Sequence, residues 1–276
     1  MKTNLLICVA LALALANLST LAAPLTESTY TEIIREVNTL STAGNPAAAK
    51  VNDVLKAPDR VRTGPESRAE LTAPDQTITR VGANTVFSFS DSGRTLNLEQ
   101  GNLLFHAPKG LGGGTIKSGG ASAAVLGTTL IVSATTDGGF KVIMLEGTGK
   151  ITLPNGKSAT LKAGQMVFVL PNGTELSKVI DINLGKLVAG SSLVSGFSHP
   201  LSSAPLIQAA VDKQNAAIAS GNAVDTGMAA NGLNALDPAS YGTAAHQPLT
   251  IQQVLVLDPA LKNIGPGGRT FTTGAF

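Results

Sequence analysis

Between Val54 and Leu170 the chain alternates short apolar runs with clusters of Gly, Pro, Asn and Asp, at intervals of about 8–12 residues. This spacing is typical of an all-β sandwich, barrel or solenoid. Residues that tolerate a positive φ stand where the chain must reverse, as in Asp91-Ser-Gly93 and Asn155-Gly156. We therefore predict a mainly β, sandwich- or solenoid-like domain over residues 54–175.

The apolar runs between these turns give the predicted strands. They are Arg68–Leu71, Ile78–Val81, Val86–Phe89, Thr95–Leu98, Leu103–His106, Ala121–Val125, Thr129–Ala134, Lys141–Leu145, Lys150–Leu153, Ala159–Leu161 and Met166–Leu170. Two further turns are predicted at Asp137-Gly-Gly139 and Asn172-Gly173.

Residues 1–22 have the pattern of a signal peptide. Lys2 is followed by an apolar run from Leu5 to Leu15, and Thr20-Leu21-Ala22 supplies small residues for cleavage after Ala22. We expect an exported protein, periplasmic or secreted; an uncleaved membrane anchor is the alternative. No later run reaches the roughly 18 apolar residues of a membrane helix, so we expect no integral membrane segment after signal removal.

The segments around the β domain are predicted from periodicity and composition. Residues 28–41, within an N-terminal segment 23–53, have helical spacing of apolar residues after a possible N-cap at Thr29. Residues 176–220 are expected to form a packed extension, with a helix that starts near Pro205 and ends near Gly221. Residues 221–276 are rich in Ala, Gly, Asn and Thr and are predicted to be a low-complexity linker and tail.

Several classes of chemistry lack the residues that they need. The single cysteine, Cys8, lies in the signal segment, so the mature chain has no thiol for disulfides, metal binding or nucleophilic attack. A formal net charge of +2 without long basic runs disfavours nucleic-acid binding. Trp is absent and Tyr occurs only at positions 30 and 241, so aromatic platforms for sugars or bases are scarce.

Three motif tests also argue against an enzyme. The stretch Gly110–Ser118 ends in Lys-Ser, but Ile116 stands where a phosphate-binding loop requires Gly, so its glycines are interpreted as an inter-strand loop. His106, His199 and His246 are isolated and form no metal-ligand pair. Ser67 and Ser122 lack the G-x-S-x-G setting of a hydrolase nucleophile. We predict no catalytic residue, metal or cofactor.

An ordered series of short motifs carries a family resemblance. The series is Val61-Arg-Thr-Gly64-Pro-Glu-Ser67-Arg68-Ala-Glu-Leu71, Asp75-Gln-Thr-Ile-Thr-Arg80-Val-Gly82-Ala-Asn84-Thr-Val86, Leu96-Asn-Leu98-Glu99-Gln-Gly101, Val125-Leu-Gly127-Thr128, Leu145-Glu146-Gly147 and Leu161-Lys-Ala-Gly164-Gln165. Over about residues 54–170 this series resembles the FecR domain. In regulators of that type, the resemblance implies, the domain lies outside the cytoplasmic membrane and relays the state of an outer-membrane transducer to a sigma-factor system. This chain lacks an internal membrane helix, so direct sigma-factor control by it alone is not expected.

The shared residues are interpreted as structural. The glycines at 64, 82, 101, 127, 147 and 164 fall at strand ends, where a residue without Cβ permits left-handed angles or close approach. Ser67, Thr128 and Glu146 accompany them in the motifs. Arg68, Glu70, Arg80 and Glu99 are expected to form a paired or solvated polar cluster over one sheet face.

The leading functional hypothesis is a non-catalytic exported protein-binding module in envelope signalling, with an envelope protein such as an outer-membrane transducer as its partner. One alternative is a structural or adhesive component of the envelope or surface, which the Ala/Gly/Asn-rich C-terminal third would fit. A second alternative is a small-ligand sensor. The sequence does not identify a signal, an oligomeric state or a link to iron.

Overall fold

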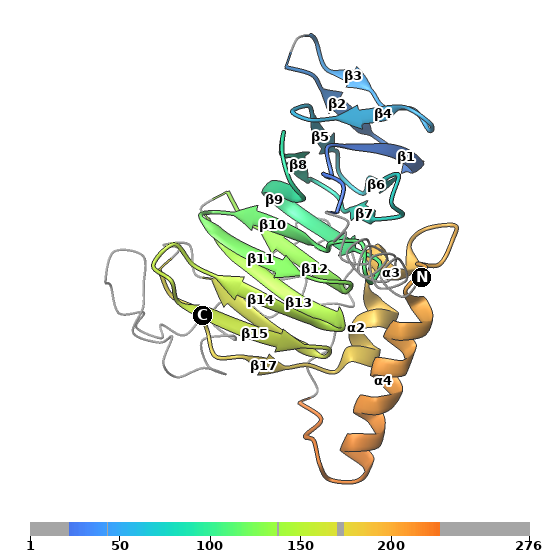
Figure 1. Ribbon diagram of the computed structural model, residues 1–276. Helices are drawn as coiled ribbons and strands as arrows, with labels where there is room; N and C mark the ends of the chain where they lie inside the picture. The colour runs from blue at the N-terminus through green and yellow to red at the C-terminus, as the bar shows by residue number, and fades with distance from the viewer. Residues whose placement is uncertain (1–21, 43, 137, 170–173, 227–276) are drawn as a thin grey trace, which may run out of the picture.

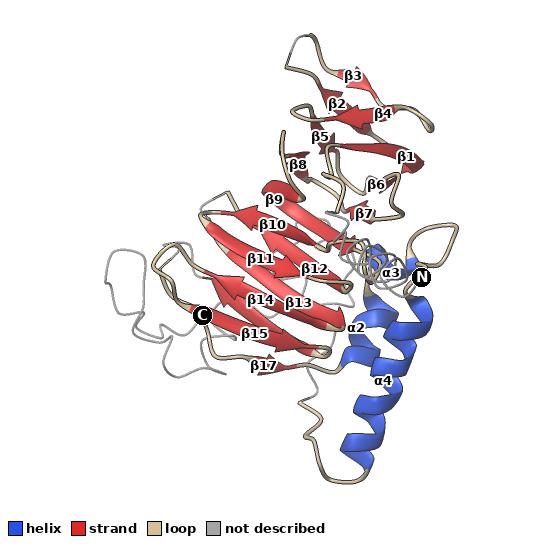
Figure 2. Ribbon diagram, viewed as in Figure 1, coloured by secondary structure: helices blue, strands red, loops and turns tan. Residues whose placement is uncertain are grey.

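The structure is a computed structural model that describes residues 22–42, 44–136, 138–169 and 174–226. Its strands form a β sandwich of two sheets, here called sheet A and sheet B, with helices along one side (Figures 1 and 2). Both sheets include the long strand β9 (Thr95–His106), which lies between β1–β8 and β10–β17 in Figure 1. A mainly β architecture is therefore confirmed.

Sheet A runs from one edge to the other through antiparallel pairs. In spatial order it contains β4 (Val54–Lys56), β1 (Glu27–Ile34), β6 (Arg68–Thr72), β7 (Ile78–Val81), the second half of β9, β12 (Thr129–Ala134), β13 (Phe140–Glu146), β16 (Gln165–Val169) and β17 (Ile180–Asp181).

Sheet B is built in the same way, except that β10 runs parallel to β9. In spatial order it contains β3 (Ala47–Ala48), β2 (Val37–Leu40), β5 (Arg60–Thr63), β8 (Val86–Phe89), the first half of β9, β10 (Gly114–Ser118), β11 (Ala121–Val125), β14 (Thr148–Thr152) and β15 (Ser158–Lys162).

Strand β9 changes sheets at Gly101. Before this residue β9 pairs with β8 in sheet B, and from Gly101 onward it pairs with β12 in sheet A. Gly101 has φ +93, and a Cβ there would collide with the Thr85 side chain. Only glycine adopts this left-handed geometry without strain, so Gly101 permits the strand to pass from one sheet to the other.

The alternation of side chains along the strands produces two apolar layers. Leu103 and Phe105 of β9 point into the core between the sheets, whereas Leu104 points to the outer face of sheet A. That outer face is covered by α2 (Leu184–Gly190), α3 (Ser192–Ser195) and α4 (Ala204–Ala219). The helices contribute buried Leu and Ile side chains to the second layer, namely Leu184, Leu187, Leu193 and Ile207.

Most of the predicted strands are present with nearly the expected bounds. The strands at 78–81, 86–89, 121–125 and 129–134 match residue for residue, and the two strands expected at 95–98 and 103–106 are one continuous β9. The helix expected after Pro205 is α4, with Pro205 in its first turn. The turn at Asn155-Gly156 joins β14 and β15, with Gly156 at φ +84.

The predicted helix at residues 28–41 is wrong, because this segment forms β1 and β2. Arg35, at φ +62, turns the chain between the two strands. β1 aligns with β6 and β4, whose backbone groups complete its hydrogen bonds. Thr29, Thr31 and Ile33 are β-branched and favour a strand once such neighbours exist, which local helical spacing does not reveal.

Part of the stretch interpreted as an inter-strand loop is also a strand. Gly110, Gly112 and Gly113 have positive φ and form the loop, but Gly114–Ser118 is β10, between β9 and β11. Several predicted features lie outside the described residues: residues 1–21 of the signal segment 1–22, residue 137 of one predicted turn, the turn at 172–173, and residues 227–276 of the predicted linker and tail 221–276. No helix in the described ranges is long and apolar enough to cross a membrane.

Candidate functional site: a buried arginine and an open sheet

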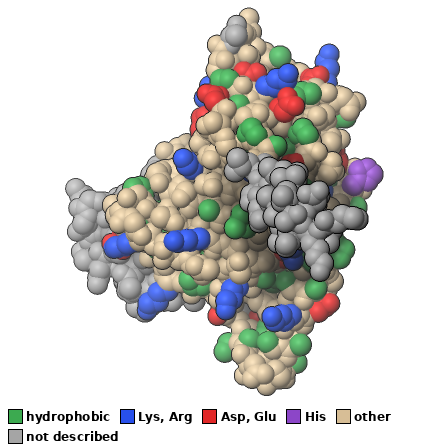
Figure 3. All heavy atoms as spheres, in the orientation of Figure 1, with side chains coloured by type: hydrophobic (Ala, Val, Ile, Leu, Met, Phe, Trp, Pro, Cys, Tyr) green, Lys and Arg blue, Asp and Glu red, His purple; other side chains and the backbone are tan. Residues whose placement is uncertain are grey.

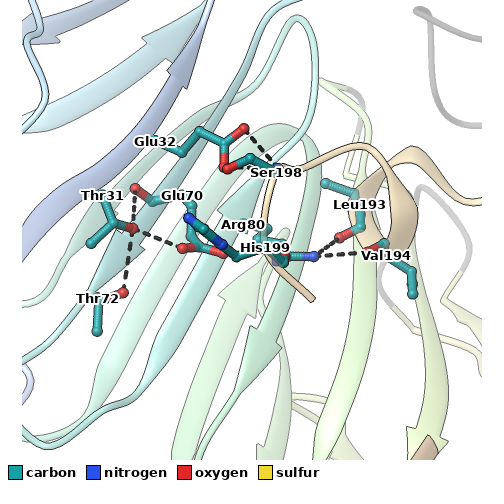
Figure 4. Close-up of polar contacts among 9 residues, drawn as sticks. All are labelled: Thr31, Glu32, Glu70, Thr72, Arg80, Leu193, Val194, Ser198 and His199. Carbon is teal, nitrogen blue, oxygen red and sulfur yellow. Dashed lines mark hydrogen bonds and ion pairs between the residues drawn. The ribbon is translucent and has the colours of Figure 1, made fainter. Parts of the chain in front are cut away.

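Arg80 of β7 joins the β sandwich to the C-terminal extension (Figure 4). Its side chain is fully buried on the outer face of sheet A. Nε donates to Glu70 Oε2 at 2.8 Å, Nη1 to the carbonyl oxygen of Val194 at 2.8 Å, and Nη2 to that of His199 at 2.6 Å. The Phe197 ring lies 4.3 Å from the guanidinium carbon. The guanidinium is therefore satisfied by one carboxylate, backbone carbonyls and a ring face.

Strands β6 and β1, which follow β7 in that order across sheet A, supply the acidic side of this cluster. Glu70 of β6 is directly opposite Arg80 in the antiparallel register. Its Oε1 accepts a hydrogen bond from Thr31 Oγ1 of β1 at 2.8 Å. Glu32 of β1 accepts from Ser198 N at 3.0 Å and from Ser198 Oγ at 2.6 Å. Strands β1 and β7 of sheet A thus bond directly to residues 193–199, and β6 between them supplies the carboxylate that pairs with Arg80 (Figure 4).

The expected cluster of Arg68, Glu70, Arg80 and Glu99 is formed only in part. Glu70 and Arg80 are paired in sheet A, whereas Glu99 lies in the sheet B half of β9 and pairs with Arg60 at 3.3 Å. The residues around Arg80 in the sequence do not indicate its other partners, because Val194 and His199 follow Arg80 by more than 100 residues.

A second buried polar cluster lies under the start of α4. Thr129 Oγ1 is 2.9 Å from His106 Nδ1, 2.9 Å from Glu146 Oε1 and 2.8 Å from Ser203 Oγ. Burial lowers the pKa of His106 and raises the pKa of Glu146, although the hydrogen bond from Thr129 opposes the second shift. In the sequence Glu146 stands in a motif and His106 is an isolated histidine, and no local pattern indicates Thr129 and Ser203 as their partners.

The remaining motif residues lie at turns and strand ends. Gly64 and Ser67 bracket the β5–β6 turn, where Ser67 Oγ accepts from Glu36 N at 3.0 Å and donates to the Pro65 carbonyl. Gly82 follows β7, Arg68 begins β6, Thr128 precedes β12, Gly147 separates β13 from β14, and Gly164 separates β15 from β16. Gly127 has φ +64, and a Cβ there would come within 2.7 Å of Lys109 Cα.

These positions bring together no catalytic constellation. The residues that the structure describes contain no group of three His, Cys, Asp or Glu side chains arranged to hold a metal ion. His106 is buried in the Thr129 cluster, His199 presents its carbonyl to Arg80, and His246 lies outside the described residues. Ser67 is committed to the β5–β6 turn, and Ser122 lies on β11.

The outer face of sheet B differs from that of sheet A. Along β10, β11, β14 and β15 the outward side chains are Thr115, Lys117, Ser122, Ala124, Thr148, Lys150, Thr152, Ser158, Thr160 and Lys162, all partly or fully exposed. Strand β15 forms the edge of this sheet and pairs with β14 alone among the described strands. Helices therefore cover the outer face of sheet A, whereas over these four strands the outer face of sheet B is open to solvent and β15 forms an open strand edge.

The class defined by these features is a two-sheet β module whose second sheet is accessible. Residues 59–148 match the model of the family "FecR protein". No curated protein matches the chain.

The chain is also similar to two crystal structures, at 1.65 and 2.50 Å resolution, of a protein from Parabacteroides distasonis described as a candidate anti-sigma factor. Both are 18% identical to this chain, with a TM-score of 0.42. The similarity covers 47% of this chain and 63% and 62% of those chains, so less than two thirds of their length is represented.

Proposed function

We propose that this protein is an exported, non-catalytic protein-binding module that acts in envelope signalling of the FecR type. The FecR domain supports a regulatory role, and the signal-peptide pattern of residues 1–22 supports export. The observation that carries the protein-binding part is the open edge of β15 at the end of sheet B.

An open edge strand presents backbone groups that an extended segment of a partner can pair with. Lys162 N donates to the side-chain oxygen of Gln165 at 3.0 Å rather than to β14. In an antiparallel pair, alternate residues direct their backbone groups to the same side, so Ser158 and Thr160 also point theirs away from β14. The edge therefore offers a site for strand addition around Thr160.

The other broad surface of the sandwich is not available for the same purpose. Leu187 of α2, Leu193 of α3 and Ile207 of α4 pack on the outer face of sheet A and are almost fully buried. Removing these helices would expose a large apolar layer, which is unfavourable at about 25 cal/mol per Å². Docking at β15 needs no such rearrangement. The partner implied by the family is an envelope protein such as an outer-membrane transducer.

Thr160→Pro tests this proposal, because proline removes the outward N–H and blocks strand addition at the edge. Thr160→Val is the matched control, since it changes the side chain and keeps the N–H. We expect the exported Thr160→Val protein to co-purify with one discrete envelope protein, and the Thr160→Pro protein to lose it at an unchanged melting temperature. If proline destabilises the fold, Ser158→Pro provides the same block one pair away. Equal co-purification by the proline and valine variants would refute the edge as the binding site.

A further inference from the structure

The open face of sheet B has an unusual composition for an exposed sheet surface. On β10, β11, β14 and β15 the outward side chains are lysines, Ser or Thr hydroxyls and one alanine, without a carboxylate. The acidic residues near its borders are already paired, Glu99 with Arg60 and Glu175 with Lys157. No described acidic side chain forms an ion pair with Lys117, Lys150 or Lys162. Their positive charge is therefore available to a ligand.

The strand registers place these three lysines on one diagonal. Thr115, Ala124, Lys150 and Thr160 form a row across the sheet; Lys117 lies two residues to one side of it on β10, and Lys162 two residues to the other side on β15. With about 4.8 Å between strands and about 3.3 Å per residue, the Cα atoms are ~12 Å apart from 117 to 150 and ~8 Å from 150 to 162. In the lower half of Figure 3, Lys and Arg side chains lie spaced apart on a largely tan surface.

Two shallow hollows lie along the same face. One, of about 500 Å³, is lined by Thr95, Thr115, Ala124, Lys150 and Thr160; the small Ala124 lies between Thr115 and Lys150 in its floor. The other, of about 510 Å³, includes Lys117, Asn97 and Ser122. Each hollow thus combines an ammonium group with hydroxyl or amide groups, the pairing that recognises a carboxylate and neighbouring hydroxyls.

A protein partner does not fit this face well. Protein interfaces have an apolar core with aromatic or aliphatic anchors. Leu126, which directly follows β11, is 78% exposed and lines the first hollow, but the outward side chains of the four strands themselves include no aromatic residue and no aliphatic residue larger than alanine. A hydrophilic linear polymer needs no such anchor, and its regularly spaced carboxylates can meet the spaced lysines while its hydroxyls meet the Ser and Thr rows.

We propose that the outer face of sheet B binds an acidic polysaccharide that carries carboxylates along its chain. Charge and hydroxyl complementarity replace the aromatic stacking for which this protein lacks residues. The polymer lies diagonally across β10, β11, β14 and β15, with the lysines on its carboxylates. This site shares β15 with the proposed protein-binding edge, but it uses the outward side chains of the strand and not its backbone groups, so it does not depend on protein binding there.

Immobilised polygalacturonate, a linear polyuronate, is the probe for this proposal, with neutral dextran as its uncharged counterpart. The diagonal variant, Lys117→Ser/Lys150→Ser/Lys162→Ser, replaces the three lysines of the diagonal with hydroxyl side chains like those around them. The matched control, Lys50→Ser/Lys186→Ser/Lys213→Ser, removes the same charge from exposed positions elsewhere. Because all six side chains are exposed, both variants should keep the parent melting temperature.

We expect the parent and the control variant to bind polygalacturonate and not dextran, with an affinity that falls as salt is raised. The diagonal variant should bind polygalacturonate about tenfold more weakly or not at all, since three ion pairs of modest strength between lysine and carboxylate are lost. No binding by the parent, or equal binding by the two variants, would overturn the proposal. Binding of polyglutamate as tightly as polygalacturonate would overturn the polysaccharide part of the proposal. Loss of protein capture by the Thr160→Pro protein concerns the β15 edge and does not count against polysaccharide binding.

Discussion

Arg80 Nη2 donates a hydrogen bond to the carbonyl oxygen of His199 at 2.6 Å, although the two residues lie 119 positions apart. Together with the bonds to Glu70 and to the carbonyls of α3, this contact fastens the C-terminal extension to the β sandwich. The extension is thus an integral layer of the fold, and the chain beyond the family match contributes to the stability of the matched part.

Arg80→Ala should lower the free energy of unfolding by about 3–5 kcal/mol, because it leaves a buried carboxylate and buried carbonyls without their cation. Arg60→Ala, which removes the exposed pair with Glu99, is the control and should cost about 0–1 kcal/mol. Denaturant titration measures both values. If the two variants unfold at the same denaturant concentration, the fastening role of Arg80 is wrong.

Gly127→Val should destabilise the protein by about 1–3 kcal/mol. Gly93→Val has a comparable positive φ, but a Cβ there meets nothing within 4 Å, so this variant measures backbone strain alone. The extra cost at position 127 is the clash with Lys109, and paired thermal melts would report it. An unchanged melt for Gly127→Val would indicate that the glycine is not structural.

The His106 cluster predicts a pH dependence with a defined sign. Burial depresses the pKa of His106 below its ordinary 6.5, so the folded state favours the neutral ring. The unfolded chain takes up the proton first, and stability present above pH 6.5 is lost as the pH falls through the folded pKa. The raised pKa of Glu146 has the opposite effect on stability. The stability that Glu146 contributes is present below pH 4.5, its ordinary pKa, and is lost as the pH rises through the folded pKa.

His106→Gln isolates the first contribution, because glutamine preserves a polar side chain that does not titrate. The difference in unfolding free energy between parent and variant should shrink as the pH is lowered from 7.5 through 6.5, and Glu146→Gln serves as the comparison. Denaturation curves at a series of pH values provide the measurement. A difference independent of pH would show that His106 is not held neutral by burial.

Exported protein should begin at Ala23, where the signal pattern places the cut after Ala22. The residues that would follow this cut are anchored in the structure, since Ala23 O accepts from Arg94 Nη1 at 2.8 Å and Leu25 is buried. N-terminal analysis of secreted or periplasmic material checks this expectation. An intact Met1 in a membrane fraction would favour the uncleaved anchor.

The sequence predicted those parts of the fold that depend on local alternation and turn residues. Val86–Phe89 and Thr129–Ala134 are bounded by turn-forming residues and alternate clearly, and both were predicted at their observed bounds. β1 was missed because Ile33, Ile34 and Val37 also fit a helical spacing, and only pairing with β6, some 40 residues later, decides for a strand. β10 was missed because a run of glycines precedes it.

The candidate site was less predictable than the fold. The motif series identified Arg80 and Glu70, but their burial results from α3 and the loop after it, whose sequence has no pattern that indicates contact with β7. The lysine diagonal likewise depends on the register of β10, β11, β14 and β15. Residues distant in sequence become neighbours only through these pairings.

The most direct test of the proposed protein-binding function is site-specific photo-cross-linking in the native envelope. A photoreactive residue replaces Ser158 on the β15 edge in one variant and Lys213 on α4 in the other; both positions are exposed. We expect one discrete protein adduct from position 158, which disappears when Thr160→Pro is added, and no such adduct from position 213. The absence of an adduct at position 158, or the same adduct from both positions, would contradict it.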